Sequence, residues 1–315
     1  MFHWDGGLKL TKADLAVDFR RRQPRAFISH AHTDHMARHA YALCTAATAA
    51  LYHFRLGARP VREMAYHEPI EWGGLRLTAY PAGHCLGSAM LLAEDGRERL
   101  LYTGDFKLDA PASCDAAELP QADLLVIEST YGRPDYRLPP RGEVLAELFE
   151  LLRKTLQRDA VPVIEAYSLG KGQEVTRLLT AEGFRVAQHE QVYQISRIYQ
   201  SFGVDLGRFT RYRGRIDPET VLIVPPRTRI QFAGRQVRFA VTGWARDERA
   251  KYRLRVDHAV PLSDHADYDD LLEAVARVNP RKVFCTHGPE SFVDRLCEAG
   301  FEAHPLGRPT QGRLF

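Results

Sequence analysis

The sequence predicts an α/β fold, either as one large domain or as a core domain that carries an insertion. The chain has 315 residues, of which 45% are hydrophobic, so it can bury a sizeable core without disulfide cross-links. Its apolar segments are short, and three of them, "GLRLTAYPAGH", "RLLYTGDF" and "ADLLVIEST", end in polar clusters. Strands that deliver ionisable residues at their ends are typical of α/β folds, which place chemistry on loops held by a rigid sheet.

Three short strands, "LKL", "LAVDF" and "RAFISH", are expected near the start of the chain, followed by a helix around Met36 to Ala42. The prolines of "YGRPDYRLPPRGE" indicate the end of this first part. An amphipathic helix in "EVLAELFELLRKTLQ" opens a second part, which contains the strands "VPVIEAY", "TVLIVPP" and "QVRFAVTGW". The last part has a strand in "HAVPL", a helix in "YDDLLEAVARV" with Asp267 as its N-cap, and a strand in "KVFCTHG".

The cysteines and the apolar runs indicate a cytoplasmic protein. The five cysteines show no CxxC spacing, and no charged-then-apolar leader precedes the first expected strand. No apolar run approaches the roughly 18 residues that are needed to cross a bilayer. We therefore expect a cytoplasmic location and no membrane association.

The positive charge of the chain is concentrated in its middle. Residues 139–255 carry 21 Lys and Arg against 13 Asp and Glu, whereas the rest of the chain carries 22 against 27. The densest part, "GRFTRYRGR" followed by "PPRTRI", interleaves arginines with Phe209 and Tyr212. This pattern is typical of a surface that contacts phosphates and stacks on bases, and also of an ordinary solvated face.

The stretch "SHAHTDH", residues 29–35, predicts a metal centre. Alternate side chains of an extended segment share a side, so His30 and His32 can hold one ion together. Asp34 and His35 fall where the chain turns and point elsewhere, which suits two adjacent metals. The further ligands that such a centre needs stand at strand ends: His84, Asp105 and His287. Several isolated histidines are expected to be structural: His3, His39, His53, His67, His189 and His304.

In their order along the chain, "SHAHTDH", "GHCLGS" and "GDF" resemble the signature of the metallo-β-lactamase fold. The resemblance implies an αββα sandwich that holds two metals at its rim. Asp18 in "LAVDF" matches the aspartate that supports the ligand loop in this superfamily. These motifs alone would also fit a glyoxalase II-like thioesterase.

The motifs "ESTYG", "PLSDHAD" and "CTHG" resemble motifs A, B and C of the β-CASP nucleases, in which an α/β domain is inserted before motif B. This resemblance covers essentially the whole chain. It implies residues 1–138 and 247–315 as the two parts of the metallo-β-lactamase domain, with residues 139–246 as the β-CASP insertion. Within the branch, "ESTYGRPDY", "AYSLGKGQE" and "VTGW" look most like the Artemis and Apollo DNA-repair group, and "YTGDFK" is similar to bacterial exonucleases associated with DNA ligases.

The resemblance also implies a set of metal ligands. One divalent metal would be held by His30, His32, His84 and Asp105. The other would be held by Asp34, His35, Asp105 and His287. Zinc is expected because the ligands are rich in imidazole, and manganese also fits a mixed set of histidines and carboxylates.

The chemistry implied by the resemblance is hydrolysis of a phosphodiester. A hydroxide between the two ions would attack phosphorus, because coordination lowers the pKa of bound water to about 7. His265 would protonate the leaving oxygen, and Glu128 would orient His265 by a hydrogen bond. The residues expected to carry the catalysis are therefore Asp34, Glu128 and His265.

Contacts to the substrate are expected at three places. Ser129, Thr130 and Tyr131 directly follow Glu128, and the resemblance implies that they help to hold a terminal phosphate. In "SLGKGQE", amides at a helix N-terminus near Ser168 and Lys171 could meet a phosphate, although a glycine-rich turn needs no ligand. Ser263 would either donate to a substrate phosphate or close a turn.

Together these features predict a metal-dependent DNA exonuclease of DNA repair that acts 5′ to 3′ and prefers a 5′-phosphate, with a DNA ligase or another repair protein as a partner. The alternative is an RNA endonuclease or exonuclease, because His287 stands where the Artemis and Apollo group has valine and RNA-processing relatives have histidine. The fold would also be compatible with a non-catalytic nucleic-acid-binding subunit or with a small-molecule thioesterase or lactamase.

Overall fold

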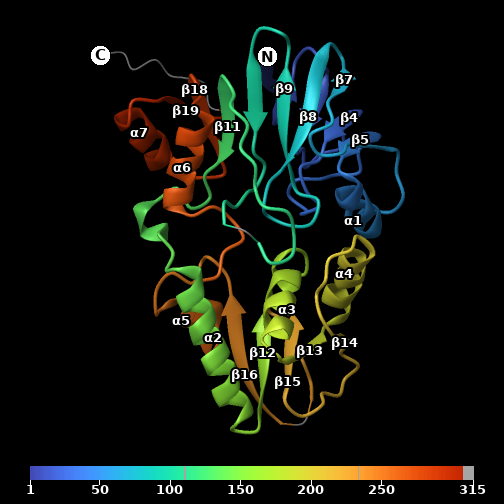
Figure 1. The fold of residues 1–315 in the computed structure, drawn as a ribbon, viewed down its shortest axis with the longest axis vertical. Coiled ribbons are helices and arrows are strands. Elements are labelled where there is room, and N and C mark those ends of the chain that lie inside the picture. The colour runs from blue at the N-terminus through green and yellow to red at the C-terminus, as the bar shows by residue number, and fades with distance from the viewer. Residues whose placement is uncertain (110, 233, 308–315) are drawn as a thin grey trace. The chain divides into compact units, whose positions relative to one another are not determined.

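The computed structural model describes residues 1–109, 111–232 and 234–307. The chain forms two compact units, each with its own hydrophobic core. The first unit contains Met1–Ala110, Asp115–Pro134 and His265–Phe315, and the second contains Pro111–Cys114 and Asp135–Asp264. Figure 1 labels the elements of both units.

The first unit is built on two sheets that share a core. The strands of the first sheet lie in chain order: β1 (Phe2–Trp4), β2 (Leu8–Leu10), β3 (Leu15–Val17), β4 (Arg25–Phe27), β5 (Tyr41–Cys44) and β6 (Val61–Glu63). The second sheet has the order β19 (Glu302–Pro305), β18 (Lys282–Thr286), β11 (Leu124–Glu128), β10 (Arg99–Tyr102), β9 (Ala89–Glu94), β8 (Leu75–Pro81) and β7 (Ile70–Trp72).

The second sheet is apolar on both faces, and this explains how the layers form. Successive side chains of a strand point to opposite faces, so in β9 Leu91 joins the core between the sheets while Leu92 joins a second core. That second core is closed by the helices α6 (Tyr268–Val278) and α7 (Glu290–Glu298), which lie beside β11 and β18 in Figure 1. The helix α1 (Ala46–Leu56) follows β5 and contacts β6 of the first sheet.

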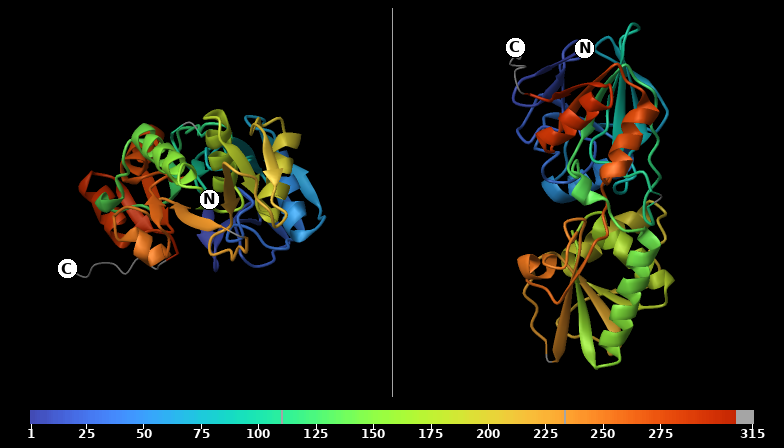
Figure 2. Two further views of the ribbon diagram at one scale, coloured as in Figure 1. Left: turned by 90° about the horizontal axis from the view of Figure 1, so that it is seen from below. Right: turned by 90° about the vertical axis from the view of Figure 1, so that its left-hand side faces the viewer.

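The second unit is a parallel six-stranded sheet with helices against one face. Its strand order is β14 (Phe209–Arg211), β13 (Arg185–Gln188), β15 (Thr220–Val224), β12 (Ala160–Glu165), β16 (Arg235–Val241) and β17 (His258–Val260). Apolar residues of α2 (Arg141–Leu156), α3 (Lys171–Ala181) and α4 (Glu190–Ser201) cover one face, and loop residues such as Tyr212 and Phe232 pack on the other. The right-hand view of Figure 2 shows α2 on one side of these strands. The short 3-10 helix η1 (Pro134–Tyr136) and the helix α5 (Ala250–Leu254) complete the elements.

The expected helix around Met36 to Ala42 is wrong, because residues 36–40 form irregular chain and β5 begins at Tyr41. Side chains replace the backbone hydrogen bonds that a helix would have made. The Tyr52 hydroxyl donates to the Ala37 carbonyl at 2.6 Å and accepts from the His39 amide at 3.2 Å. The N-cap expected at Asp267 is confirmed, since its side chain accepts from the backbone amides of Asp269 and Asp270.

The end of the second unit lies later than the expected boundary after residue 246. The segment from 247 to 264 contains β17, which pairs in parallel with β16 through Phe239–His258 and Val241–Val260. A strand that completes a sheet stays with that sheet, so the unit extends to Asp264. The first boundary falls between Pro134 and Asp135, close to the expected position at 138.

The sheet order of the first unit brings three strand ends to one edge. β10, β11 and β18 are neighbours and run parallel, so their carboxyl ends lie side by side. Asp105 follows β10, Glu128 ends β11, and His287 follows β18 directly. Among the residues that the structure describes, no helix is long and apolar enough to cross a membrane.

Candidate metal centre

The ligand-rich stretch is held in place by a buried strand and a buried carboxylate. β4 is followed by Ile28 and Ser29, both buried, and the chain then turns through residues 30–35. The carboxylate of Asp18 accepts from the amide of Ser29 at 2.7 Å, and also from its hydroxyl. Asp18 itself has a left-handed backbone, with φ of 50°. Such a conformation is unfavourable for a non-glycine residue, so the surrounding contacts must hold it.

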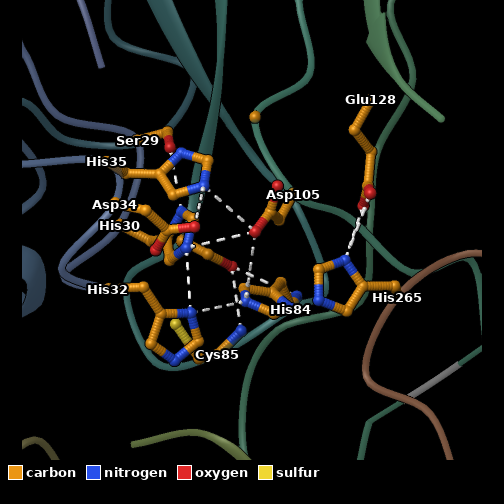
Figure 3. Close-up of polar contacts among 12 residues, drawn as sticks. Ser29, His30, His32, Asp34, His35, His84, Cys85, Asp105, Glu128 and His265 are labelled. Atoms are coloured by element: carbon orange, nitrogen blue, oxygen red, sulfur yellow. Dashed lines mark hydrogen bonds and ion pairs between the residues drawn. The ribbon is translucent and has the colours of Figure 1, made fainter. Parts of the chain in front are cut away.

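Four of the expected ligands meet in one cluster. Each of His30, His32, His84 and Asp105 offers one ligand atom, and these atoms all lie within 4.8 Å of one another. His32 Nδ1 lies 3.0 Å from Nε2 of His30 and 3.0 Å from Nε2 of His84. Figure 3 shows the four side chains pointing toward a common centre. Three ring nitrogens and a carboxylate oxygen that converge in this way match the donor set of a zinc site.

The other expected ligands gather around His35. Its Nε2 lies 3.2 Å from Oδ2 of Asp105 and 3.8 Å from Oδ2 of Asp34. The ring of His287 is centred 5.7 Å from the ring of His35. Asp105 therefore borders both sets, as a bridging carboxylate would. The side chains of this second set are more widely spaced than those of the first.

Asp18 also orients His35 from behind. Its Oδ2 lies 2.8 Å from His35 Nδ1, and it accepts a hydrogen bond from the Tyr102 hydroxyl at 2.8 Å. With Nδ1 engaged, His35 presents Nε2 to Asp105. Contacts of this kind fix the tautomer and the ring orientation of a metal-binding histidine.

The charges of the cluster are strongly coupled. Burial lowers the pKa of His30 well below its usual value, and the neighbouring His35 lowers it further. Burial also opposes the charged form of His35, but the carboxylates of Asp105 and Asp18 outweigh it and raise its pKa well above the usual value. Burial alone would raise the pKa of Asp105, whereas His35 and His265 hold it well below the usual value. His30 is thus kept neutral and Asp105 ionised, which are the forms that bind a metal ion.

A second pair of ionisable residues borders the cluster. Nδ1 of His265 lies 3.0 Å and 3.2 Å from the two carboxylate oxygens of Glu128. Glu128 is itself fixed, because it accepts from the Phe106 amide at 3.0 Å and from the Thr130 hydroxyl at 2.6 Å. The ring of His265 is centred 4.7 Å from that of His84. Figure 3 shows the Glu128–His265 pair beside Asp105 and His84.

Comparison with known proteins agrees with this geometry. A family model described as "Zn-dependent metallo-hydrolase RNA specificity domain" matches residues 249–305, which include His265 and His287. A protein of Opitutus terrae named "Probable DNA ligase" is 40% identical over 316 residues, which cover 98% of this chain and 31% of that protein. The last part of the chain thus matches a family of zinc-dependent metallo-hydrolases, and nearly the whole chain is similar to part of the ligase-named protein.

Further proteins are matched over shorter stretches of the chain. Proteins named "Endoribonuclease YSH1" from Eremothecium gossypii and Yarrowia lipolytica are 32% and 35% identical over 121 residues. These matches cover 38% of this chain and 15% and 14% of the two relatives. The chain thus spans less than a third of the length of the curated relatives it matches.

A solved structure has a similar fold. It is a protein of unknown function from Enterococcus faecalis, with a TM-score of 0.57 and 17% sequence identity. The match covers 84% of this chain and 75% of that one. At this identity the likeness concerns the fold alone.

The donor atoms of the cluster fit a divalent metal. His32 Nδ1 faces two other ring nitrogens at hydrogen-bond distance, and it can share a proton with only one of them. A cation at the centre would be a common partner for all three nitrogens and for Asp105. The family described as zinc-dependent agrees with this chemistry.

The residues expected to touch substrate have very different surroundings. Ser129, Tyr131, Lys171 and Ser263 are buried, whereas Thr130 and Ser168 are half-buried. The Ser129 hydroxyl donates to the Thr286 carbonyl at 3.1 Å, and the Thr130 hydroxyl is used by Glu128. The ammonium of Lys171 lies 2.7 Å from a Glu174 oxygen and 3.7 Å from an Asp264 oxygen, so it is already ion-paired within the second unit.

Sequence reasoning overlooked two contributors to the surroundings of the centre. Tyr102 stands two residues before Gly104 at the end of β10, and its position on the same face as Asp18 appears only once the strands are paired. Arg20 donates to the Asp34 carbonyl at 3.1 Å. Its signal was present in the sequence as the run "FRRRQPR", residues 19–25, which follows Asp18 directly.

Proposed function

We propose that this metallo-hydrolase is a DNA exonuclease that removes nucleotides from the 5′ end and prefers a 5′-phosphate. The observation that carries the proposal is the placement of the Glu128–His265 pair beside the cluster of His30, His32, His84 and Asp105. A metal-ligand cluster with an adjacent proton donor has the parts that phosphodiester hydrolysis requires. The insertion of the β-CASP type would correspond to the second unit.

Seven residues would hold two divalent ions, zinc or manganese, in this proposal: His30, His32, Asp34, His35, His84, Asp105 and His287. When bound, such ions supply an activated water molecule and offset the charge on the phosphoryl oxygens. Asp105 would serve both ions, since its Oδ2 lies 3.5 Å from His30 Nε2 and 3.2 Å from His35 Nε2. Asp34 would share in fixing the reacting phosphate.

His265 would carry the proton to the leaving oxygen. Its Nδ1 is engaged by Glu128, and Nε2 would meet the leaving oxygen of the substrate. The Glu128 carboxylate stabilises the protonated ring, and the bonds from Phe106 and Thr130 prevent it from turning away. One fifth of the His265 side chain is exposed, which gives a strand access to the ring.

The positive charge of the second unit would bind the polyanion. Residues 139–255 carry eight more basic than acidic residues, as counted from the sequence. Cationic side chains release counterions from a bound strand and so drive its association. We include a DNA ligase or another repair protein as a partner, because the relative named as a ligase matches nearly the whole of this chain.

An RNA endonuclease or exonuclease is the second candidate. The matched family model is described by RNA specificity, and the YSH1 relatives are named as endoribonucleases. DNA is favoured here because the ligase-named relative is 40% identical over 98% of the chain, whereas the YSH1 relatives match only 38% of it.

The test is a parallel digestion of DNA and RNA strands of identical sequence, labelled at one end and prepared with and without a 5′-phosphate. We expect shortening of the DNA strands from the 5′ end, faster with the phosphate, in the presence of zinc or manganese. Asp105→Ala, the matched inactive control, should shorten neither. Degradation of RNA alone would establish the second candidate instead.

A further inference from the structure

A cavity opens beside the metal centre and within the first unit. It has a volume of about 480 Å³ and is bordered by Asp34 and His287. That volume falls in the range of pockets that bind small organic groups, about 300–1,000 Å³. Its other walls come from the hairpin of β1 and β2 and from the loop after β3.

Two aromatic rings of the cavity wall pack directly against glycines. A Cβ atom added to Gly307 would lie 2.4 Å from the indole of Trp4, and one added to Gly7 would lie 2.5 Å from the ring of Phe19. Only glycine therefore lets these rings approach the backbone so closely. Trp4 is nevertheless 46% exposed, so part of its flat surface is open to a ligand.

The rim of the cavity is positively charged. Arg20 and Arg21 line it, and Arg22 is the next residue of the same exposed loop. Arg20 is tied to Asp34, whose carbonyl accepts from it at 3.1 Å. Within the described residues, neither Arg21 nor Arg22 has a carboxylate oxygen within 4 Å of its side chain. These two guanidinium groups can pair with phosphates, and the flat aromatic surface beside them can stack on a base. Together they suit a nucleotide.

We propose that this cavity and the loop of Arg20, Arg21 and Arg22 bind a nucleotide of single-stranded nucleic acid next to the metal centre. The base would stack on Trp4, and the flanking phosphates would pair with Arg21 and Arg22. The inference rests on the proposed nuclease function and adds a strand contact of the first unit to it. A run of arginines usually belongs to an ordinary solvent-exposed surface. Here the run borders a base-sized cavity that ends at Asp34 and His287.

The phosphate contacts are tested with the double variant Arg21→Gln/Arg22→Gln. Binding of a fluorescent single strand is followed by anisotropy at several salt concentrations, in an Asp105→Ala background that does not degrade the probe. We expect the dissociation constant to rise roughly tenfold and the slope of log affinity against log salt to fall by about 1.4, since each lost phosphate contact removes about 0.7. The matched control is Arg97→Gln, an exposed arginine in the β9–β10 turn, at the end of β10 opposite Asp105.

The chemistry should survive the loss of these arginines. Hydrolysis of bis(p-nitrophenyl) phosphate, which has no strand to bind, should be unchanged in Arg21→Gln/Arg22→Gln. A loss of this activity would mean that the double substitution disturbs the centre, and the proposed binding role would then be rejected.

The base contact is tested with Trp4→Ala and Trp4→Phe. Stacking on an aromatic side chain contributes about 1–3 kcal/mol per base, so Trp4→Ala should weaken binding roughly tenfold while Trp4→Phe retains most of the affinity. An abasic residue is then moved along the strand. At one position it should weaken wild-type binding and leave Trp4→Ala unaffected.

The outcomes separate this inference from the proposed function. Suppose that the wild-type protein degrades strands while Arg21→Gln/Arg22→Gln binds them with the affinity and salt slope of Arg97→Gln. The proposed phosphate contacts of Arg21 and Arg22 are then wrong, and the nuclease function stands. If no abasic position distinguishes wild type from Trp4→Ala, the base contact is wrong. A wild-type protein that neither binds nor degrades any strand would overturn the function first.

Discussion

Glu128 and His265 lie 137 positions apart in the sequence and form a pair whose geometry depends on the carboxylate. Two further donors, the Phe106 amide and the Thr130 hydroxyl, hold that carboxylate in place. The pair lies next to the cluster, since ligand atoms of Glu128, His265 and Asp105 are within 4.8 Å of one another, but neither Glu128 nor His265 is among the proposed ligands. Its contribution to turnover can therefore be measured without removing a ligand.

We predict that Glu128→Gln lowers kcat roughly 100-fold, within the range that general acid–base catalysis contributes. Glutamine keeps the size of the side chain but no longer stabilises a protonated imidazole. Metal content, measured by elemental analysis, should be unchanged. Thr130→Val is the graded control, because it removes one donor to Glu128 and should cost much less. Full turnover in Glu128→Gln, or a loss of metal together with activity, would refute the role.

His39 provides a prediction about pH. The ring is buried and both its nitrogens face backbone amides, those of Gln23 at 3.1 Å and Ala37 at 3.2 Å. Burial lowers its pKa from 6.5 to about 4, and a protonated ring would oppose donors with donors. The unfolded chain therefore binds a proton more readily between pH 6.5 and 4, so stability falls as the pH is lowered through this range.

The size of this effect can be read from a variant. His39→Gln should remove up to about 3 kcal/mol of the pH-dependent loss of unfolding free energy between pH 6.5 and 4. Urea unfolding of the metal-free proteins at a series of pH values measures it. Parallel stability curves for the two proteins would show that His39 does not titrate in this way.

At the scale of elements, the turn after β18 is built by close contact. A Cβ added to Gly288 would lie 2.0 Å from the backbone oxygen of Ser129, and His287 beside it has a left-handed backbone with φ of 59°. The turn that carries His287 is thus pressed against the segment that follows β11. Its conformation is set by its neighbours rather than by local preference.

Gly288→Ala should therefore destabilise the protein by about 1–3 kcal/mol, as overpacking commonly does, and should lower activity by displacing His287. Gly142→Ala in the first turn of α2 is the control, because its added Cβ meets nothing within 4 Å and alanine favours a helix. The two variants should shift the urea midpoint in opposite directions. A Gly288→Ala protein as stable as wild type would remove the steric argument.

Much of the fold at this scale could be predicted from the sequence. Apolar runs followed by ionisable residues located β8, β10 and β11, and the periodic segment after Asp267 located α6. The segment around Met36 could not be predicted, because its backbone groups are satisfied by Tyr52 from a later helix. The cavity beside Asp34 was likewise invisible, since residues near 4, 20 and 306 meet only in the folded sheets.

At the scale of the whole molecule, contacts between distant segments again could not be predicted from the sequence. This affects both the boundaries of the units and the site. The change in composition near Pro139 was the basis of the first expected boundary, whereas β17 joins the sheet of the second unit through backbone bonds that leave no mark in composition. The family resemblance grouped His30, His32, His84 and Asp105 as one set of ligands, and the structure places one ligand atom of each within 4.8 Å of the others. The sequence alone did not show that the Lys171 side chain is buried and ion-paired.

The division into two units leads to a prediction for unfolding. All the proposed ligands lie in the first unit, so bound zinc should stabilise that unit and leave the second unchanged. Calorimetry of the full chain should show two transitions, of which one rises by about 2–4 °C for each kcal/mol of binding free energy. Adding a chelator should reverse that shift alone. Equal movement of both transitions would contradict separate units.

The order of the strands has a consequence for synthesis of the chain on the ribosome. Asp105 and Glu128 are made before most of the second unit, whereas β18, with His287 after it, is made after that unit and joins the sheet beside β11. A nascent chain therefore holds an incomplete set of the proposed ligands until the second unit has been synthesised.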